Sequence, residues 1–262
     1  MYTKMLHKIE TAYSPQGGKA YSKEVIREAV ENYRKIAVAC SFGKDSMATV
    51  LLAREVHPEI PVFSIMTVFK PKETFDYLVR MDKLLNLNVT VYMVARDVPP
   101  VLKENGIEVR LLPAGRFEKE CSDVEMVYGS KIYDVAPNRC CELLKVEPAK
   151  EAVKDLDAWV CGLRNTEGRT RKSYREIEFR GLVKVNPILN WTEEDVRGYL
   201  EAEGVELHPW YNQLFSDGRR IRSIGCEPCT SPVYDWQEER EGRWNGTSKC
   251  GGECGIHTRR LK

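Results

Sequence analysis

The chain lacks any long run of apolar residues. Its first residues, Met1–His7, do not form the apolar stretch of a secretory signal peptide. No later segment approaches the about 18 uninterrupted apolar residues that a helix needs to span a membrane. These absences argue against an exported or membrane-spanning protein, so we expect a cytoplasmic protein without a membrane partner.

The chain also lacks an excess of charge of one sign. Lysine and arginine number 40 and aspartate and glutamate 39, so the formal net charge is +1. A protein that attracts nucleic acid through its overall field is strongly basic, and we therefore expect no nucleic-acid partner. A local basic site for a small anion is compatible with this balance. Internal repeats and low-complexity tracts are absent as well, and the composition is typical of a globular protein.

Cysteine, in contrast, is abundant. The 262 residues include nine cysteines, an odd number. In a reducing compartment such a content favours metal binding or thiol chemistry over a framework of disulfides.

Short apolar strands alternate with helical patterns along the first part of the chain. The predicted elements are a helix from Ser22, a strand at Ile36–Cys40, a helix at Met47–Val56, a strand at Pro61–Thr67, a helix at Glu73–Asn86 and a strand at Asn88–Ala95. Strands joined by helices at this spacing imply right-handed crossovers and a parallel sheet.

Two more strands are predicted further along the chain, at Ala158–Gly162 and Leu182–Val185. Thr192 is a candidate N-cap for a helix that ends near Glu203. The fold class is therefore α/β, an open and mostly parallel sheet with flanking helices. Residues 1–21 are read as an N-terminal extension, residues 22–230 as the α/β domain, and residues 231–262 as a glycine-rich C-terminal segment that packs loosely or moves.

A candidate anion loop lies between the first strand and the helix after it. Its residues are Ser41, Phe42, Gly43, Lys44, Asp45 and Ser46. Backbone N–H groups at a helix N-terminus bind anions, Gly43 permits a close approach, and Lys44 adds charge. The spacing differs from a Walker A loop. It resembles the Ser-Gly-Gly-Lys-Asp-Ser pyrophosphate loop of adenine nucleotide α-hydrolase folds, with Phe42 in place of the first glycine.

Four cysteines form a candidate metal site. Cys140 and Cys141 are adjacent, and Cys226 and Cys229 form a C-x-x-C pair. Four thiolates complete either a tetrahedral zinc site or an iron–sulfur site, because sulfur ligands select these metals. Cys40, Cys121 and Cys161 lie in or near apolar runs and are expected to be core residues.

The C-terminal run Glu253-Cys254-Gly255-Ile256-His257 closely resembles the Glu-Cys-Gly-Leu-His signature of the sulfonucleotide reductases. The stretch Glu239–Trp244 and the segments Leu182–Thr192 and Leu207–Asn212 resemble the same family, in the same order. The paired cysteines resemble those of its iron–sulfur type, the assimilatory adenylyl-sulfate reductases. The resemblance runs from about Ile36 to His257.

This resemblance implies a function. Cys254 would attack the sulfur of adenylyl sulfate (APS), giving an S-sulfocysteine and AMP, and a thioredoxin- or glutaredoxin-like thiol would then release sulfite in sulfate assimilation. The four cysteines would hold a [4Fe–4S] cluster, with zinc as the alternative, and Lys145 would lie between cluster and substrate. His257 belongs to the catalytic signature. We also expect a homo-oligomer.

The nucleophile is a thiolate, so a nearby positive charge is expected to lower the pKa of the Cys254 thiol. The candidate charges are Arg240, Arg243, His257, Arg259 and Arg260. Guanidinium groups also suit sulfate and phosphate oxygens. The candidate substrate residues outside the loop are Thr67, Gly162, Arg164, Arg171, Arg240 and Arg243.

The chain departs from the family at two places. The turn after the second strand has Met66-Thr67-Val68 where the family has Asp-Thr-Gly, and it adds Lys70 and Lys72, either to accept a 3′-phosphate or to face solvent. Cys250 is also unexpected, and it either resolves the catalytic thiol as a disulfide or has no role.

Three alternatives to an APS reductase stay open. The same mechanism could act on the 3′-phosphorylated nucleotide (PAPS). The nucleotide loop also fits an ATP-pyrophosphatase-type enzyme for sulfur insertion, although the Cys254 signature does not. A zinc-stabilised nucleotide-binding regulator is the non-enzymatic alternative.

Overall fold

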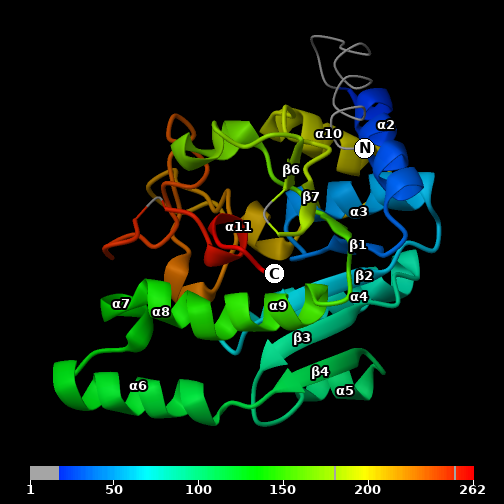
Figure 1. The fold of residues 1–262 in the computed structure, drawn as a ribbon. Helices are drawn as coiled ribbons and strands as arrows, with labels where there is room; N and C mark the ends of the chain where they lie inside the picture. Colours follow the sequence, from blue (N-terminus) through cyan, green and yellow to red (C-terminus); the bar gives the residue numbers. More distant parts are fainter. Residues whose placement is uncertain (1–17, 180, 251) are drawn as a thin grey trace.

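The structure, a computed structural model, describes residues 18–179, 181–250 and 252–262. Residues 1–17 of the predicted N-terminal extension lie outside the described residues. The strands are β1 (Ile36–Ala39), β2 (Val62–Met66), β3 (Thr90–Val94), β4 (Glu108–Leu112), β5 (Ala158–Val160), β6 (Ile177–Phe179) and β7 (Val183–Val185). Within the described residues they form one sheet in the order β4-β3-β2-β1-β5-β7-β6. Figure 1 shows β4 and β6 at its opposite edges.

Every neighbouring pair of strands in this sheet is parallel except β6 and β7, which pair antiparallel. The predicted α/β class with a mostly parallel sheet is therefore confirmed. The sequence patterns did not predict β4 and β6, because an edge strand needs little apolar sequence. Glu108, Leu111 and Phe179 are exposed on these two edge strands.

The helices surround this sheet. They are α2 (Lys19–Asn32), α3 (Lys44–Val56), α4 (Lys72–Leu85), α5 (Pro100–Glu104), α6 (Gly115–Tyr128), α7 (Ile132–Val135), α8 (Pro137–Cys141), α9 (Glu147–Val153), α10 (Glu193–Ala202) and α11 (Gly255–Thr258). Short 3₁₀ turns occur at Asn165–Glu167, Arg169–Arg171, Pro209–Asn212 and Glu227–Cys229. The oxygen of Thr192 accepts a hydrogen bond from the Asp195 N–H at 3.1 Å, which confirms the predicted N-cap of α10. Among the described helices, none is both long and apolar enough to cross a membrane.

Alternating side chains of the strands build a core on each face of the sheet. On β1, Ile36 and Val38 join the larger core with residues of α2, α3, α4 and α10, whereas Ala37 points to the other face. There it packs in a second core that includes Val153 of α9 and Trp159 of β5. Because both faces are covered, the carboxyl ends of the strands are the edge left to form a site.

The stretch from α8 to α9 is interrupted by a π-helical turn at Glu142–Val146. This turn follows the adjacent cysteines directly, and such wider turns are frequent at functional sites. It includes Lys145, and α11 of the C-terminal segment lies beside it (Figure 1).

The C-terminal segment does not pack loosely, contrary to the expectation. Trp244 is only 1% exposed and contacts a cluster formed by Cys141, Cys226 and Cys229, and Leu261 is buried in the second core. The glycine-rich sequence gave no sign of this packing, because only a few large side chains make the contacts. Whether the segment moves during function stays a prediction.

Candidate active site

The predicted nucleotide loop, residues 41–46, joins the carboxyl end of β1 to the N-terminus of α3. The Ser46 hydroxyl accepts a hydrogen bond from the Ser41 backbone N–H at 3.1 Å and donates one to the Gly43 carbonyl at 2.9 Å. The side chain of Ser46 thus fixes the backbone of the loop to which it belongs. The start of α3 contributes the positive end of a helix dipole, which favours a bound anion.

Phe42 has a backbone conformation that favours glycine, the residue of the resembling loop at this position. Its φ is 61°, in the left-handed region that a non-glycine residue adopts at a cost. The ring compensates by packing in the larger core, edge to face with Tyr77 at 6.5 Å between centroids. Phe42 therefore shapes the loop from the core side, and it does not line the cavity described next.

A cavity of about 170 Å³ lies between this loop, the carboxyl ends of the central strands and the C-terminal segment. It is lined by many of the residues predicted for substrate binding or catalysis: Ser41, Gly43, Asp45, Ser46, Lys145, Gly162, Arg171, Arg240, Arg243, Cys254 and His257. Segments more than 200 residues apart in sequence, such as Ser41 and Cys254, thus meet in one pocket.

Gly162 lets the strand β5 approach the nucleotide loop closely. A Cβ at this position would lie 2.6 Å from the backbone oxygen of Asp45, which no side chain tolerates. The missing side chain of Gly162 therefore serves this close packing. Gly162 also lines the cavity, and a part in substrate binding stays a prediction.

Four predicted substrate residues do not line this cavity, namely Phe42, Lys44, Thr67 and Arg164. Thr67 instead places its hydroxyl 3.2 Å from the sulfur of Cys226. Direct contact of these four side chains with substrate stays a prediction. In this structure the two cations, Lys44 and Arg164, are paired with internal carboxylates instead.

The Glu239 carboxylate, from the C-terminal segment, holds both of these buried cations. Lys44 Nζ lies 2.6 Å from Glu239 Oε2, and Arg164 Nη2 lies 2.7 Å from the same oxygen. Arg164 also reaches Asp45 at 2.5 Å. Burial alone would raise the pKa of Asp45, but Arg164 and Lys44 outweigh it and lower that pKa to about 2. The loop is thereby tied to the C-terminal segment by ion pairs.

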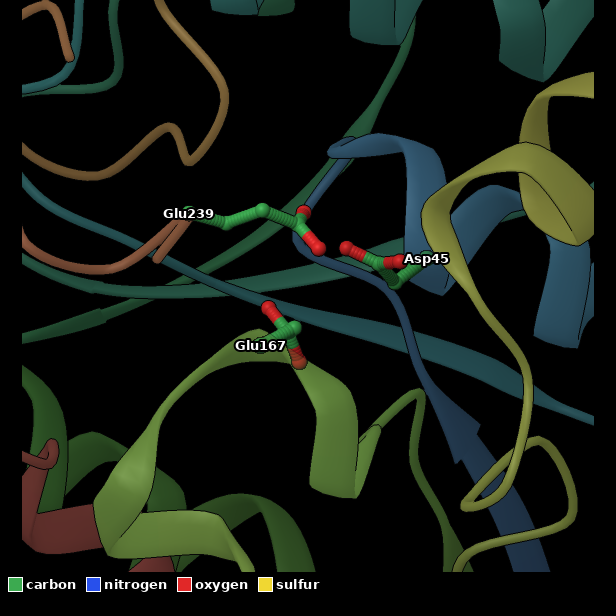
Figure 2. Close-up of side chains that lie close together, drawn as sticks. All are labelled: Asp45, Glu167 and Glu239. Atoms are coloured by element: carbon green, nitrogen blue, oxygen red, sulfur yellow. The ribbon is translucent and has the colours of Figure 1, made fainter. Parts of the chain in front are cut away.

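Figure 2 shows the carboxylates of Asp45, Glu167 and Glu239 pointing toward one another. Their oxygens lie within 4.8 Å of one another. Each of the three is paired with arginine, since Arg164 holds Asp45 and Glu239, and Arg171 holds Glu167. The arginines already balance this acidic group.

A second buried network surrounds Glu253, the residue before Cys254. Arg171 Nε lies 2.6 Å and Arg240 Nη2 3.1 Å from the Glu253 carboxylate. The same carboxylate accepts a hydrogen bond from the Cys254 backbone N–H at 2.8 Å. Although burial opposes it, the charges of Arg171 and Arg240 hold the pKa of Glu253 well below its usual range. Glu253 therefore fixes the backbone that carries the candidate nucleophile.

The four predicted metal cysteines come together from two distant parts of the chain. Cys140, Cys141, Cys226 and Cys229 are buried, carry no disulfide and line one small hollow with Lys145. Lys145 also lines the larger cavity. It therefore lies between the four-cysteine hollow and the cavity that contains Cys254, where the resemblance expected it.

Cys254 lies against Cys141 in this structure. The hydrogen bond from the Cys254 thiol, helped by the charge of Lys145, lowers the pKa of Cys141 to about 6 in spite of burial. The same hydrogen bond, together with burial, raises the pKa of Cys254 well above its usual value. The expected lowering of the Cys254 pKa is thus wrong for this arrangement, because the hydrogen bond to Cys141 and burial outweigh the charge of Lys145.

Two of the groups that were expected to activate the Cys254 thiol make other contacts. His257 stacks on Trp159 with 6.0 Å between ring centroids, and burial lowers its pKa well below the usual value, which disfavours the charged form of the ring. Arg259 pairs with Glu142. Arg243 does line the cavity, and Gly225 leaves room for its guanidinium, which a Cβ at that position would contact at 1.9 Å.

The phosphoadenosine phosphosulfate reductase domain family matches residues 35–232, three quarters of the chain. The chain belongs to this family. Among its relatives, the adenosine 5′-phosphosulfate reductase of Halalkalibacterium halodurans is 32% identical over 240 residues, which cover 90% of this chain and 91% of that protein. The enzyme of the same name from Streptomyces coelicolor is 31% identical, with 91% and 89% covered. The family and enzyme class predicted from the sequence are confirmed.

A solved structure in the same family has a similar fold. The phosphoadenylyl-sulfate (PAPS) reductase from Candida auris, a phosphate complex, is 20% identical, covers 81% of this chain and 90% of that one, and has a TM-score of 0.58. The predicted fold class is confirmed by this likeness as well as by the observed sheet.

Several residues of the site in this phosphoadenosine phosphosulfate reductase family member were not predicted. Glu239 and Glu253 lie within stretches that resemble the family, but their sequence gives no sign that they pair with Lys44 and Arg171. Lys70, predicted only to accept a 3′-phosphate or face solvent, lines the cavity, and burial followed by the charge of Lys145 lowers its pKa to about 8. Burial of a lysine in a polar turn leaves no periodic signal in a sequence.

Proposed function

We propose that this protein reduces adenosine 5′-phosphosulfate to sulfite and AMP, with Cys254 as the nucleophile. The observation that carries this proposal is a single cavity lined by the nucleotide loop, by arginines and by Cys254, with the four cysteines behind Lys145. The names of its relatives support the same substrate.

The reaction proceeds in two stages. The thiolate of Cys254 attacks the sulfur of the sulfonate, an S–S bond forms, the S–O bond to the phosphate breaks, and AMP leaves. The thiolate of a dithiol donor then attacks Cys254 Sγ and releases sulfite. Its second thiol resolves the mixed disulfide and returns Cys254 to the thiol form, so the donor supplies the two electrons. We propose a thioredoxin- or glutaredoxin-like donor.

The residues of the cavity suit these steps. The backbone N–H groups of residues 41–46 and the α3 dipole would hold the nucleotide phosphate. Arg243 and Lys145 line the cavity beside Cys254 and would stabilise negative charge on the sulfonate and on the leaving sulfite. To react, Cys254 must exchange its contact with Cys141 for the substrate sulfur, and the bound sulfonate would favour its thiolate through Lys145.

The four-cysteine hollow fits an iron–sulfur cluster better than zinc. A tetrahedral zinc with bonds of 2.3 Å would bring its sulfur ligands to about 3.8 Å from one another. In the described part of the chain, the ligand-type side chains whose donor atoms all lie within 4.8 Å are Asp45, Glu167 and Glu239, and no three cysteines meet this limit. An iron–sulfur cubane holds each thiolate on a separate iron and spaces them more widely.

We therefore propose that Cys140, Cys141, Cys226 and Cys229 hold a [4Fe–4S] cluster. When bound, it would supply a fixed charge that tunes the field at Lys145. Thr67 would donate its hydroxyl hydrogen to the sulfur of Cys226, and Lys145 would connect this charge to the substrate cavity. A cytoplasmic location and a homo-oligomer stay predictions.

The intact mass of the protein after incubation with APS tests the proposed function. We expect a sulfonate adduct on Cys254, release of AMP, and sulfite on addition of thioredoxin, all lost in Cys254→Ser. Cys250→Ser is the matched control and should keep the adduct. An absence of both adduct and sulfite would refute the reductase. An adduct with PAPS and none with APS would reassign the substrate to the 3′-phosphorylated nucleotide.

The metal content of the purified protein tests the proposed cluster separately. Four irons and a broad absorbance near about 400 nm are expected. One zinc and no colour would replace the cluster by zinc and would leave the thiol chemistry of Cys254 standing.

A further inference from the structure

Lys70 is a buried cation that the family resemblance does not account for. It lies in the turn between β2 and α4 and is only 9% exposed. Its backbone N–H donates to the Thr67 carbonyl at 3.1 Å, and the carbonyl of the preceding Phe69 accepts from the Glu227 N–H at 2.8 Å. These two bonds fix the turn to the C-x-x-C region.

The Lys70 side chain lines the same cavity as Lys145, Arg243 and Cys254. No hydrogen bond or ion pair to its ammonium group is found within residues 18–179, 181–250 and 252–262. Two residues away, Lys72 shows the ordinary alternative, since its side chain is 85% exposed and pairs with Asp76 at 2.8 Å. Lys70 is therefore not a solvated surface charge.

The cations around the cavity divide into two groups. Lys44, Arg164, Arg171 and Arg240 are neutralised by carboxylates of the protein itself. Lys70 and Lys145 are not paired with any carboxylate of the described chain, and Arg243 bonds only to backbone carbonyls, those of Cys229 and Ile224. The negative groups that act on the two lysines are cysteine thiols, Cys226 and Cys40 for Lys70, and Cys226, Cys254 and Cys141 for Lys145. Because no carboxylate of the described chain neutralises these buried ammonium groups, this part of the cavity is suited to an anion that arrives from outside.

We propose that Lys70 is a substrate-contacting residue that, together with Lys145, binds the sulfonate oxygens of the sulfonucleotide. This inference rests on the proposed function. Lys145 is an electrostatic neighbour of Cys254 and of Lys70, so the two lysines lie near the nucleophile, which must reach the sulfonate sulfur. The 3′-oxygen of the ribose lies on the opposite ring face from C5′, so a 3′-phosphate and the 5′-linked sulfonate project from different faces.

The consequence is selectivity between substrate and product. AMP carries the same adenosine and phosphate as APS but no sulfonate, so only APS would use Lys70. The paired cations and the loop would hold both nucleotides alike. Lys70 would thus increase the affinity for substrate without increasing the affinity for the AMP that must leave.

Equilibrium binding to the cluster-loaded protein in a Cys254→Ser background tests this inference, since no adduct then forms. The ligands are APS, AMP, PAPS and adenosine 3′,5′-bisphosphate. Lys70→Met should lower the affinity for APS and for PAPS by at least about tenfold, as expected for the loss of a hydrogen bond to a charged group. It should lower the affinity for AMP by less than about twofold. Lys72→Met is the matched control and should leave all four affinities unchanged, and Lys70→Arg should recover part of the loss.

Three outcomes would overturn the inference. An equal loss of affinity for AMP and APS would mean that Lys70 contacts the nucleotide part of the ligand or only stabilises the fold. Weakening confined to PAPS and the bisphosphate would assign it to the 3′-phosphate. Loss of the absorbance near 400 nm in Lys70→Met would make it a partner of the cluster. If the parent protein binds APS no better than AMP, the inference alone fails. If it binds neither APS nor PAPS, the proposed function fails as well, and this result is visible before any Lys70 variant is made.

Discussion

Residues 41–46 and the C-terminal segment face each other across one cavity, yet different interactions hold them. The loop continues from a buried strand, and Phe42 anchors it in the larger core. The segment is fixed by a few buried ion pairs, chiefly those of Glu239 and Glu253 with Lys44, Arg164, Arg171 and Arg240, and by Trp244.

This difference has a functional meaning. Apolar packing is insensitive to pH and to bound anions, so β1 and Phe42 give the loop a constant base, although Lys44 and Asp45 of the same loop take part in the ion pairs. Buried ion pairs exchange partners when another anion arrives, because a guanidinium binds phosphate or sulfate as well as carboxylate. The region that carries the nucleophile is thus held mainly by interactions that a substrate can replace, whereas the loop keeps an apolar anchor, Phe42, that a substrate does not replace.

Shortening Phe42 should give the largest effect and tests the apolar half of the comparison. We expect Phe42→Ala to lower the free energy of unfolding by about 4 kcal/mol, because a buried ring is lost from the core. Phe42→Gly should be about 1 kcal/mol more stable than Phe42→Ala, the reverse of the usual order, because φ is 61° there. Urea denaturation measures both, and an alanine variant as stable as the glycine variant would show that no strain is stored.

Neutralising Glu253 tests the ionic half. Glu253→Gln leaves the buried Arg171 and Arg240 without their shared charge, so we expect a loss of about 3 kcal/mol. Limited proteolysis should then cut within the C-terminal segment before the rest of the domain. Glu238→Gln, which removes a longer and more exposed pair with Arg169, is the control and should cost less than about 1 kcal/mol. Similar losses in the two variants would contradict the importance of the buried pair.

The pH dependence of that loss is the next smaller effect. The pKa of Glu253 lies well below its ordinary value of 4.5 in the folded protein, so its contribution is complete above that value and is lost as pH falls below it. The difference in unfolding free energy between the parent and Glu253→Gln should therefore be constant near pH 7 and shrink below about pH 5. A difference that grows on acidification would have the wrong sign for this ion pair.

Replacing Cys250 should have the smallest effect. Its side chain is exposed and lines a separate surface hollow with Tyr234 and Gln237, not the cavity of Cys254. Cys250→Ser should change the free energy of unfolding by no more than about 0.5 kcal/mol, and sulfite release should be unchanged. A variant that forms the adduct on Cys254 but releases sulfite slowly would instead identify Cys250 as a resolving thiol, and non-reducing peptide mapping of the parent would then show the disulfide.

The sequence allowed most of the fold to be predicted, because its signals are local. The strands at Ile36–Cys40 and Pro61–Thr67 are continuous apolar runs, and the capping pattern at Thr192 predicts the helix that follows it. The edge strands β4 and β6 were missed for the opposite reason, since half-exposed strands carry no such run. Many of the residues that line the cavity were also predicted, but Glu253 was not, and neither was the partner of each charge.

The sequence by itself determined the chemistry present: an anion loop after a strand, four thiols in two pairs, and a cysteine in a family signature. Only the tertiary structure decided which of the cations are neutralised from within and which are left for a ligand. Lys44 and Lys70 look alike in the sequence, but Lys44 meets Glu239 from a segment 195 residues away, whereas Lys70 meets no carboxylate of the described chain. The charge balance of a buried group depends on what folding brings beside it, and no local pattern encodes that.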